Sequence, residues 1–248
     1  MKYIEIAVAY ESESFADFMQ LVRKPEISIE FPPNGELARK VISRSNAKAT
    51  GKLPSWKMGR SLHYESKHER NAFKLLNACP QVSAILEQPC IIRYVMNGEN
   101  HIHYPDILVK LPTGNELLEV KTAEDASSVE VSERTKFMTQ ALPHLGYSYR
   151  ILEAEQLAKL PRLTTVETIL KFGRSPVSFQ RREQIRQLFK SNISICWGAF
   201  KPGMPLEKYR NNICRLILEG TLRIDFNNPY TDSSVIHSVG NCNGDTSW

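Results

Sequence analysis

The chain has 248 residues, a net charge of +5 and 42% hydrophobic residues, a composition typical of a folded protein with one large domain or two modest ones. No apolar run approaches the ~20 residues that span a bilayer, and the N-terminus lacks a basic region followed by a small-residue cleavage site. Five cysteines without a C-x-x-C spacing argue against a disulfide framework and against a zinc cluster. We therefore expect a cytoplasmic protein with free thiols and no membrane contact.

Residues 1–60 predict an N-terminal segment with a basic arm. From residue 39 to residue 60 the chain carries seven basic residues and no acidic one, is interrupted by glycine and proline, and includes Trp56. Such an arm can follow a phosphate backbone or can be a solvated linker, and both interpretations stay open here. The arm residues that we predict to contact DNA are Arg39, Lys40, Arg44, Lys48, Lys52, Lys57 and Arg60.

Residues 61–158 predict an α/β domain with a mixed sheet. The pattern gives a helix over 66–78, strands over 90–96, 102–110 and 117–121, a helix with a serine cap over 132–145, and a strand over 147–152. Asn97-Gly98 between the first two strands is a strong hairpin signal. The last strand follows a crossover helix, so we expect it to pair in parallel.

Residues 159–226 predict a mostly helical unit, and residues 227–248 a poorly ordered tail. Three helices, over 163–171, 178–190 and 206–219, precede a strand in which Leu222, Ile224 and Phe226 alternate, an order that suggests a winged helix. Between residues 160 and 226 there are twelve basic and five acidic residues, so this block has a net charge of +7. Contact with nucleic acid and a role in protein docking both fit that charge.

The candidate site lies on two neighbouring strands. Glu119 and Lys121 are two residues apart in a strand, so they point to the same face, and Asp106 lies on the strand before them. Paired carboxylates repel each other and need a cation, and hard oxygen ligands suit Mg²⁺ with water and phosphate completing the shell. A lysine beside the metal can orient the attacking water or stabilise charge on the scissile phosphate. The pattern predicts phosphodiester hydrolysis, whereas a strand-end acid and a solvated strand face are the structural alternative.

Other residues extend the candidate site. Glu69 opens the first helix and can be a third metal ligand, although Ser66-x-x-Glu69 is also a capping box. His68 at the helix start and Lys136 on the crossover helix are further candidates for contact with DNA. His101 and His103 alternate before Asp106, and we interpret them as ordinary strand histidines in preference to transition-metal ligands.

The stretch from residue 62 to residue 152 resembles the catalytic domain of the TnsA family, the endonuclease subunits of heteromeric cut-and-paste transposases. The matching positions are Ser66, Glu69, Val82, Ile85, Glu87-Gln88-Pro89, Pro105-Asp106 and Glu119-Val120-Lys121. The Glu-Gln-Pro element makes the match more specific than the degenerate PD-(D/E)xK nuclease pattern that Asp106, Glu119 and Lys121 form by themselves. The resemblance implies a restriction-endonuclease-like core followed by a winged-helix-like domain.

The resemblance also implies a site and partners. Glu69, Asp106 and Glu119 would bind Mg²⁺, for which Mn²⁺ can substitute, together with the Val120 carbonyl, and Lys121 would be the catalytic lysine; some members carry glutamine at the position of Glu119. The family cuts the 5′ ends of a transposon, while an integrase-like transposase cuts and joins the 3′ ends. The C-terminal domain docks onto an ATPase regulator of transposition. This implies a prokaryotic protein that is nucleoid-associated when active.

Two other functions remain open from the residues. A restriction or repair nuclease with the same motif would cut DNA with Mg²⁺ and without partners. A non-catalytic DNA-binding adapter would carry Asp106, Glu119 and Lys121 only as a surface ion network and would bind no metal.

Overall fold

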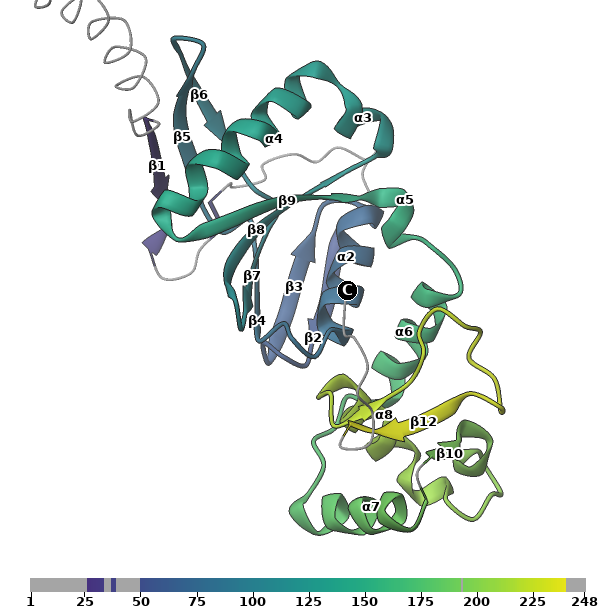
Figure 1. The fold of residues 1–248 in the computed structure, drawn as a ribbon. Helices are drawn as coiled ribbons and strands as arrows, with labels where there is room; N and C mark the ends of the chain where they lie inside the picture. The colour runs from purple at the N-terminus through teal and green to yellow at the C-terminus, as the bar shows by residue number, and fades with distance from the viewer. Residues whose placement is uncertain (1–25, 34–36, 39–49, 193, 240–248) are drawn as a thin grey trace, which may run out of the picture.

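The computed structural model describes residues 26–33, 37–38, 50–192 and 194–239. These residues form a mixed α/β structure with four small sheets and seven α-helices (Figure 1). Within the described ranges no helix has both the length and the apolar character needed to cross a membrane.

A four-stranded sheet in the order β4-β7-β8-β9 forms the centre of the first part of the chain. Its strands are β4 (Ala84–Glu87), β7 (Ile107–Leu111), β8 (Gly114–Lys121) and β9 (Tyr147–Glu153). The strands β4, β7 and β8 are antiparallel, whereas β9 runs parallel to β8, as the crossover predicted. Alternate side chains of β8 enter two hydrophobic clusters, Leu118 on the side of the helix α2 and Leu117 on the side of the helix α4. The sheet is therefore covered on both faces.

The helix α2 (Lys67–Ala78) confirms the predicted helix and begins at Ser66, whose side chain accepts a hydrogen bond from the Glu69 N–H. Ala72, Phe73 and Leu75 are buried on its inner face, which packs against the sheet. The helix is amphipathic, and its apolar face fixes its N-terminal end near the start of β7 and the end of β8.

The crossover consists of α3 (Ala123–Ser127), α4 (Val129–Ala141) and the 3₁₀ turn η2 (Leu142–Leu145). Ser128 caps α4, so the helix begins one turn earlier than the predicted start at Ser132. The Val131 N–H donates to Ser128 Oγ, whereas the Ser132 N–H already donates to the Ser128 carbonyl inside the helix.

A second sheet, in the order β1-β5-β6, contains β1 (Ile27–Glu30), β5 (Ile91–Met96) and β6 (Glu99–His103). The predicted hairpin is confirmed, because Asn97 and Gly98 have φ of 54° and 80°, the positive values that a tight two-residue turn requires. The predicted strand over 102–110 is wrong as a single element. It breaks at Tyr104-Pro105-Asp106, where proline offers no N–H, and β6 and β7 enter different sheets.

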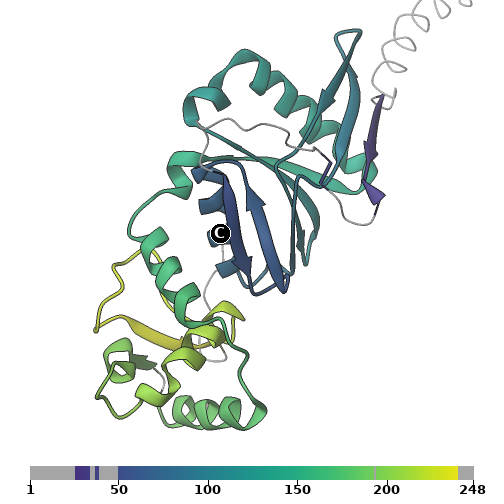
Figure 2. The ribbon, with the colours of Figure 1, turned by 180° about the vertical axis from the view of Figure 1, so that it is seen from behind.

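A hairpin of β2 (Gly51–Ser55) and β3 (Arg60–Tyr64) packs beside α2 (Figure 2). Ser55 Oγ donates to Asn77 Oδ1 at 2.6 Å, and Trp56 Nε1 donates to the Asn77 carbonyl at 2.9 Å. Residues 51–60, which the sequence placed in the N-terminal arm, therefore belong to the folded unit. Alternate apolar side chains of the hairpin, such as Leu62, enter the core.

The C-terminal part is mostly helical, with a small sheet in the order β10-β12-β11. Its elements are α5 (Ala154–Leu157), α6 (Arg162–Phe172), α7 (Phe179–Ser191), β10 (Ser194–Cys196), η3 (Trp197–Phe200), η4 (Glu207–Tyr209), α8 (Arg210–Leu218), β11 (Leu222–Arg223) and β12 (Val235–Ser238). The three predicted helices are confirmed, but the predicted strand over 222–226 is only two residues long. Residues 235–238 were expected in the disordered tail, yet they form the central strand, with Ile236 fully buried.

The two parts of the chain share one hydrophobic cluster, which extends from Leu62 to Ile236. The helix α6 packs on α2, and Gly220 fits against Pro80, so closely that an added Cβ would lie 2.7 Å from the proline Cβ. Across the same contact the Arg215 guanidinium lies 3.9 Å from the Trp56 ring centroid. The C-terminal part is thereby fixed at the C-terminal end of α2, away from the N-terminal end where Glu69 lies.

Candidate metal and catalytic centre

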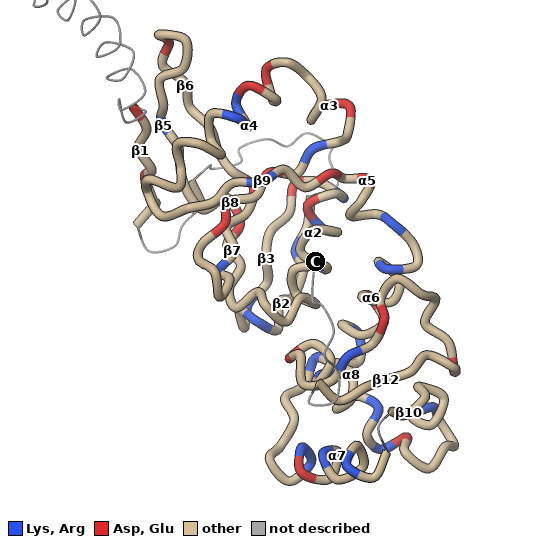
Figure 3. Tube along the Cα trace, in the orientation of Figure 1, with Lys and Arg blue, Asp and Glu red and all other residues tan. Residues whose placement is uncertain are grey.

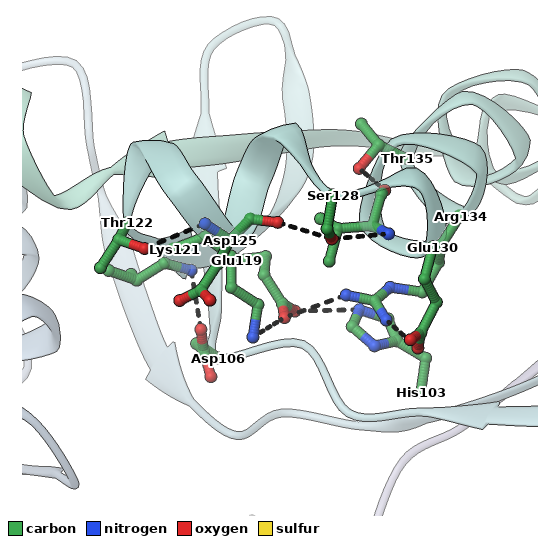
Figure 4. A network of polar contacts seen from close by, with 12 residues as sticks. His103, Asp106, Glu119, Lys121, Thr122, Asp125, Ser128, Glu130, Arg134 and Thr135 are labelled. Carbon is green, nitrogen blue, oxygen red and sulfur yellow. Dashed lines mark hydrogen bonds and ion pairs between the residues drawn. The ribbon is translucent and has the colours of Figure 1, made fainter.

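The structure brings Asp106, Glu119 and Lys121 together at one end of the central sheet. Asp106 directly precedes β7, whose first residue, Ile107, pairs with Leu118, so the register puts Asp106 opposite Glu119. The Val120 N–H donates to Asp106 Oδ2 at 2.7 Å, which ties the start of β7 to the end of β8 (Figure 4). The expected juxtaposition of the two carboxylates is present.

The surroundings of Asp106 disfavour its ionised form. Burial raises its pKa from 3.8 to about 7, and the nearby charges of Glu119 and Glu69 act in the same direction. The hydrogen bond from Val120 and the charge of Lys121 oppose the shift but do not cancel it. A cation at this place would stabilise the ionised form of Asp106.

The surroundings of Glu119, unlike those of Asp106, favour its ionised form, although Glu119 is only 4% exposed. Its Oε1 lies 2.9 Å from Lys121 Nζ and 3.5 Å from Arg134 Nη2, and its Oε2 lies 3.0 Å from His103 Nε2 (Figure 4). Burial raises its pKa, but the contacts with His103 and Lys121 outweigh burial and hold the pKa below its ordinary value. Glu119 is therefore an ionised, firmly held carboxylate.

Lys121 stays a cation in this cluster. Burial lowers its pKa, but the charge and hydrogen bond of Glu119, followed by the charge of Asp106, raise it above the ordinary value. Its ammonium pairs with Glu119 and acts on Asp106 only through its charge, and it is a positive charge that can face an anionic substrate.

Glu69 has both of the features that its position in the sequence suggested. Its Oε2 accepts from the Glu65 N–H at 2.8 Å and its Oε1 accepts from the Ser66 hydroxyl at 2.9 Å, so it supports the helix start one residue before the Ser66 N–H that a regular capping box uses. Its charge nevertheless raises the pKa of Asp106, which places it near the other carboxylates. Capping and proximity to the site coexist in the structure.

The donor chemistry of the cluster fits a hard divalent cation. Asp106 supplies a half-buried carboxylate that forms no ion pair within the described residues, and such an oxygen ligand is one that Mg²⁺ accepts alongside water and phosphate. Glu119 fits less directly, because its oxygens already contact Lys121, Arg134 and His103. Over the part of the chain that the structure describes, no three His, Cys, Asp or Glu side chains are already gathered as a metal-binding group. Metal binding by Glu119 would require Lys121 and Arg134 to move.

The predicted DNA-contacting residues separate into four groups. Lys52 and Lys136 are exposed, and Lys52 lies on the β2–β3 hairpin. Lys57 and Arg60 have internal partners: Lys57 Nζ donates to two backbone carbonyls at 2.8 and 2.6 Å, and Arg60 forms two hydrogen bonds with the buried Glu87. His68 is half-buried, and its Nδ1 has no hydrogen-bond partner. The remaining predicted positions, outside the described residues, are Arg39, Lys40, Arg44 and Lys48.

Three residues around Glu119 were not predicted as part of the site. His103 comes from β6, Arg134 from α4 and Tyr149 from β9, and the Tyr149 hydroxyl lies 3.1 Å from His103 Nε2. His101, by contrast, stacks on Tyr94 with ring centroids 5.1 Å apart. Because side chains alternate along a strand, the sequence placed His101 and His103 on one face of the same strand. It did not show that this strand borders the candidate site.

Comparison with known protein families found no matching family model. Comparison with curated proteins likewise found no match.

Proposed function

We propose that this protein is a Mg²⁺-dependent DNA endonuclease subunit of a transposase of the TnsA type, which cuts the 5′ ends of a transposon during cut-and-paste transposition. The observation that carries the proposal is the arrangement of Asp106, Glu119 and Lys121, in which a half-buried carboxylate whose ionised form is disfavoured adjoins a second carboxylate and a lysine. This arrangement suits phosphodiester hydrolysis better than it suits a structural ion network, because a network of that kind would pair both acids.

In the proposed mechanism each residue has one task. Asp106 and Glu119 would hold Mg²⁺ together with the Val120 carbonyl, and Glu69 would contribute a third carboxylate. When bound, Mg²⁺, or Mn²⁺ in its place, neutralises the carboxylates and acidifies a bound water. Lys121 orients the attacking water and stabilises negative charge on the scissile phosphate.

The arrangement of elements supports the same proposal. A mixed sheet with α2 on one face, α4 on the other and a parallel β8–crossover–β9 unit is compatible with a restriction-endonuclease-like core. We relate the C-terminal helices and their three-stranded sheet to a winged-helix-like domain.

The proposed partners are an integrase-like transposase subunit, double-stranded DNA at the transposon ends, and an ATPase regulator that docks on the C-terminal part. A groove of about 510 Å³ there has an apolar floor and basic residues along α7, where Figure 3 shows several Lys and Arg positions. Phe179 at its edge is 86% exposed. Arg182 and Arg186 already pair with Glu219 and Glu183, so this surface suits above all the apolar side chains of a protein partner. The proposed setting is the cytoplasm of a prokaryote, on the nucleoid when active.

A non-catalytic DNA-binding adapter is the second candidate, and one observation favours it. Glu119 is held by Lys121, Arg134 and His103, and these contacts give it a structural role without a metal. An adapter of this kind would bind no Mg²⁺ and would tolerate Lys121→Ala.

The test is strand-mapped cleavage of a labelled transposon-end duplex with Mg²⁺, the partner transposase and its regulator. Asp106→Ala should abolish only the 5′-strand cut, with 3′ cutting and joining retained, whereas Asp125→Ala, which changes an exposed aspartate on α3, should cut both strands. Normal cutting by Asp106→Ala would contradict the proposal and favour the adapter. Robust cutting by this chain without partners would favour a restriction or repair nuclease.

A further inference from the structure

Four basic side chains where α6, α7 and α8 meet pack on aromatic rings instead of pairing with acids, and we call them the basic patch. They are Lys171, Arg181, Lys208 and Arg210. Lys171 Nζ and the Arg210 guanidinium carbon lie 5.5 and 4.0 Å from the centroid of the Phe172 ring. The Arg181 guanidinium carbon and Lys208 Nζ lie 5.0 and 5.2 Å from the centroid of the Tyr209 ring. Because Tyr209 and Arg210 are consecutive, the four cations belong to one continuous surface.

The charge of the basic patch is not neutralised by the described part of the chain. None of its residues forms an ion pair there, although several other basic residues of the same helical part pair with acids. Those paired residues are Arg182, Arg186, Lys201 and Arg215. Glu207, which precedes Lys208, instead accepts from the Gly203 N–H at 2.8 Å. An aromatic ring is an electrically neutral partner, so it holds a cation in place and leaves the positive charge available to a ligand.

The surroundings of the basic patch favour a phosphate ligand. None of its residues lines the apolar groove beside α7, whereas protein interfaces are built around an apolar centre with aromatic anchors. Single-stranded nucleic acid binds by stacking its bases on exposed rings, but Phe172 is half-buried, Tyr209 is 7% exposed, and both already carry cations. Protein–DNA interfaces are polar and strongly positive, and most of their contacts go to the phosphate backbone. The backbone of a duplex is therefore the ligand that fits this surface best.

We propose that Lys171, Arg181, Lys208 and Arg210 bind the phosphate backbone of duplex DNA without reading its sequence. Lys171 and Lys208 are exposed, while Arg181 and Arg210 are half-buried, so the two lysines make the outer contacts. The inference goes beyond the proposed nuclease activity, because this contact exists whether or not the chain cuts the DNA that it binds.

The experiment measures the affinity of the full chain for a short fluorescent duplex of arbitrary sequence, by anisotropy in EDTA at several salt concentrations. Lys171→Gln/Lys208→Gln should reduce the slope of log affinity against log salt by about two, and should weaken binding about 10- to 100-fold at about 0.1 M salt. Lys208→Gln alone should reduce the slope by about one, so the test does not depend on the folding of the double variant.

The matched control is Arg186→Gln/Lys201→Gln, which removes the same charge from side chains that pair with Glu183 and Asp232. Its slope should stay within about 0.5 of the wild-type slope, because these cations already have anionic partners.

Three results would overturn the inference. The first is a wild-type slope in Lys171→Gln/Lys208→Gln, or a reduction in the control that is equally large. The second is tighter binding of the corresponding single strand than of the duplex. The third is a polyglutamate peptide that binds as tightly as the duplex, which would assign the basic patch to an acidic protein partner. None of these results bears on the proposed metal site, because binding is measured without a divalent cation.

Discussion

Asp106 should destabilise the fold at neutral and alkaline pH, and Asp106→Asn should relieve this cost. In the folded chain the pKa of Asp106 is raised from 3.8 to about 7. Such a shift disfavours the ionised form by about 4 kcal/mol, at about 1.36 kcal/mol per pKa unit. A folded state that binds the proton more tightly than the unfolded state loses stability as pH rises from 3.8 through about 7.

The asparagine can still accept the Val120 N–H, so that hydrogen bond is retained. Allowing for local relaxation, we expect Asp106→Asn to be about 2 kcal/mol more stable than wild type at pH 8. For a chain of this size that corresponds to a rise of about 4–8 °C in Tm. At pH 4 or below the difference should fall toward zero, because Asp106 is protonated in the folded wild type.

The assay is thermal unfolding in EDTA and in Mg²⁺ at both pH values. Wild type should gain Tm on addition of Mg²⁺ at pH 8, since a bound cation neutralises Asp106, whereas the variant should gain little. Asp125→Asn, at an exposed aspartate, should match wild type throughout. A variant that is less stable than wild type at pH 8, or a wild type whose Tm ignores Mg²⁺, would refute this reasoning.

Contacts outside the site give three further expectations. Arg60→Ala should lower the free energy of unfolding, measured in urea, by about 2–4 kcal/mol, because it leaves the 3%-exposed Glu87 side chain without its guanidinium partner. The double variant Arg60→Ala/Glu87→Gln should be more stable than Arg60→Ala, and equal stability of the two would argue against a penalty for the buried charge. When the affinity for duplex DNA is measured against salt concentration, Lys136→Ala should reduce the slope of log affinity against log salt by about one. Lys57→Met should leave this slope unchanged, because the Lys57 ammonium donates to two backbone carbonyls, and a reduced slope in Lys57→Met would contradict this. Gly220→Ala should lower the stability in thermal unfolding by about 1–3 kcal/mol, because the φ of Gly220 is +76° and the new Cβ would lie 2.7 Å from the Pro80 Cβ. An unchanged Tm would contradict the assigned geometry.

Local signals in the sequence predicted the helices and the hairpin well. Asn97-Gly98 and the Ser66 cap each act through neighbouring backbone, so the residues alone were enough to predict them. The strand change at Pro105 was harder, because alternating apolar residues continue on both sides of the break and the pattern does not show which sheet a strand joins. The same limit explains why residues 235–238 were assigned to a tail, since this strand is buried by elements far away in sequence.

The candidate site was predicted along β7 and β8 and at Glu69 in the first turn of α2. Asp106 and Glu119 are joined by one turn, so strand register could bring them together without further information. His103 and Arg134 reach Glu119 from a second sheet and from the crossover helix. Such contacts depend on how layers pack, and no spacing in the sequence encodes them. For a related reason the sequence did not show that Lys57 and Arg60, which it placed in the basic arm, contact groups in the folded core.

The position of Mn²⁺, found by anomalous scattering from a crystal of the full chain soaked with the ion, tests the central claim most directly. We predict an anomalous peak within about 2.0–2.6 Å of an Asp106 carboxylate oxygen and of Glu119 Oε1, with Lys121 and Arg134 displaced from that oxygen. A crystal in which the ion binds elsewhere, and in which Glu119 keeps its contacts with Lys121 and Arg134, would contradict the account of this cluster as a catalytic metal site.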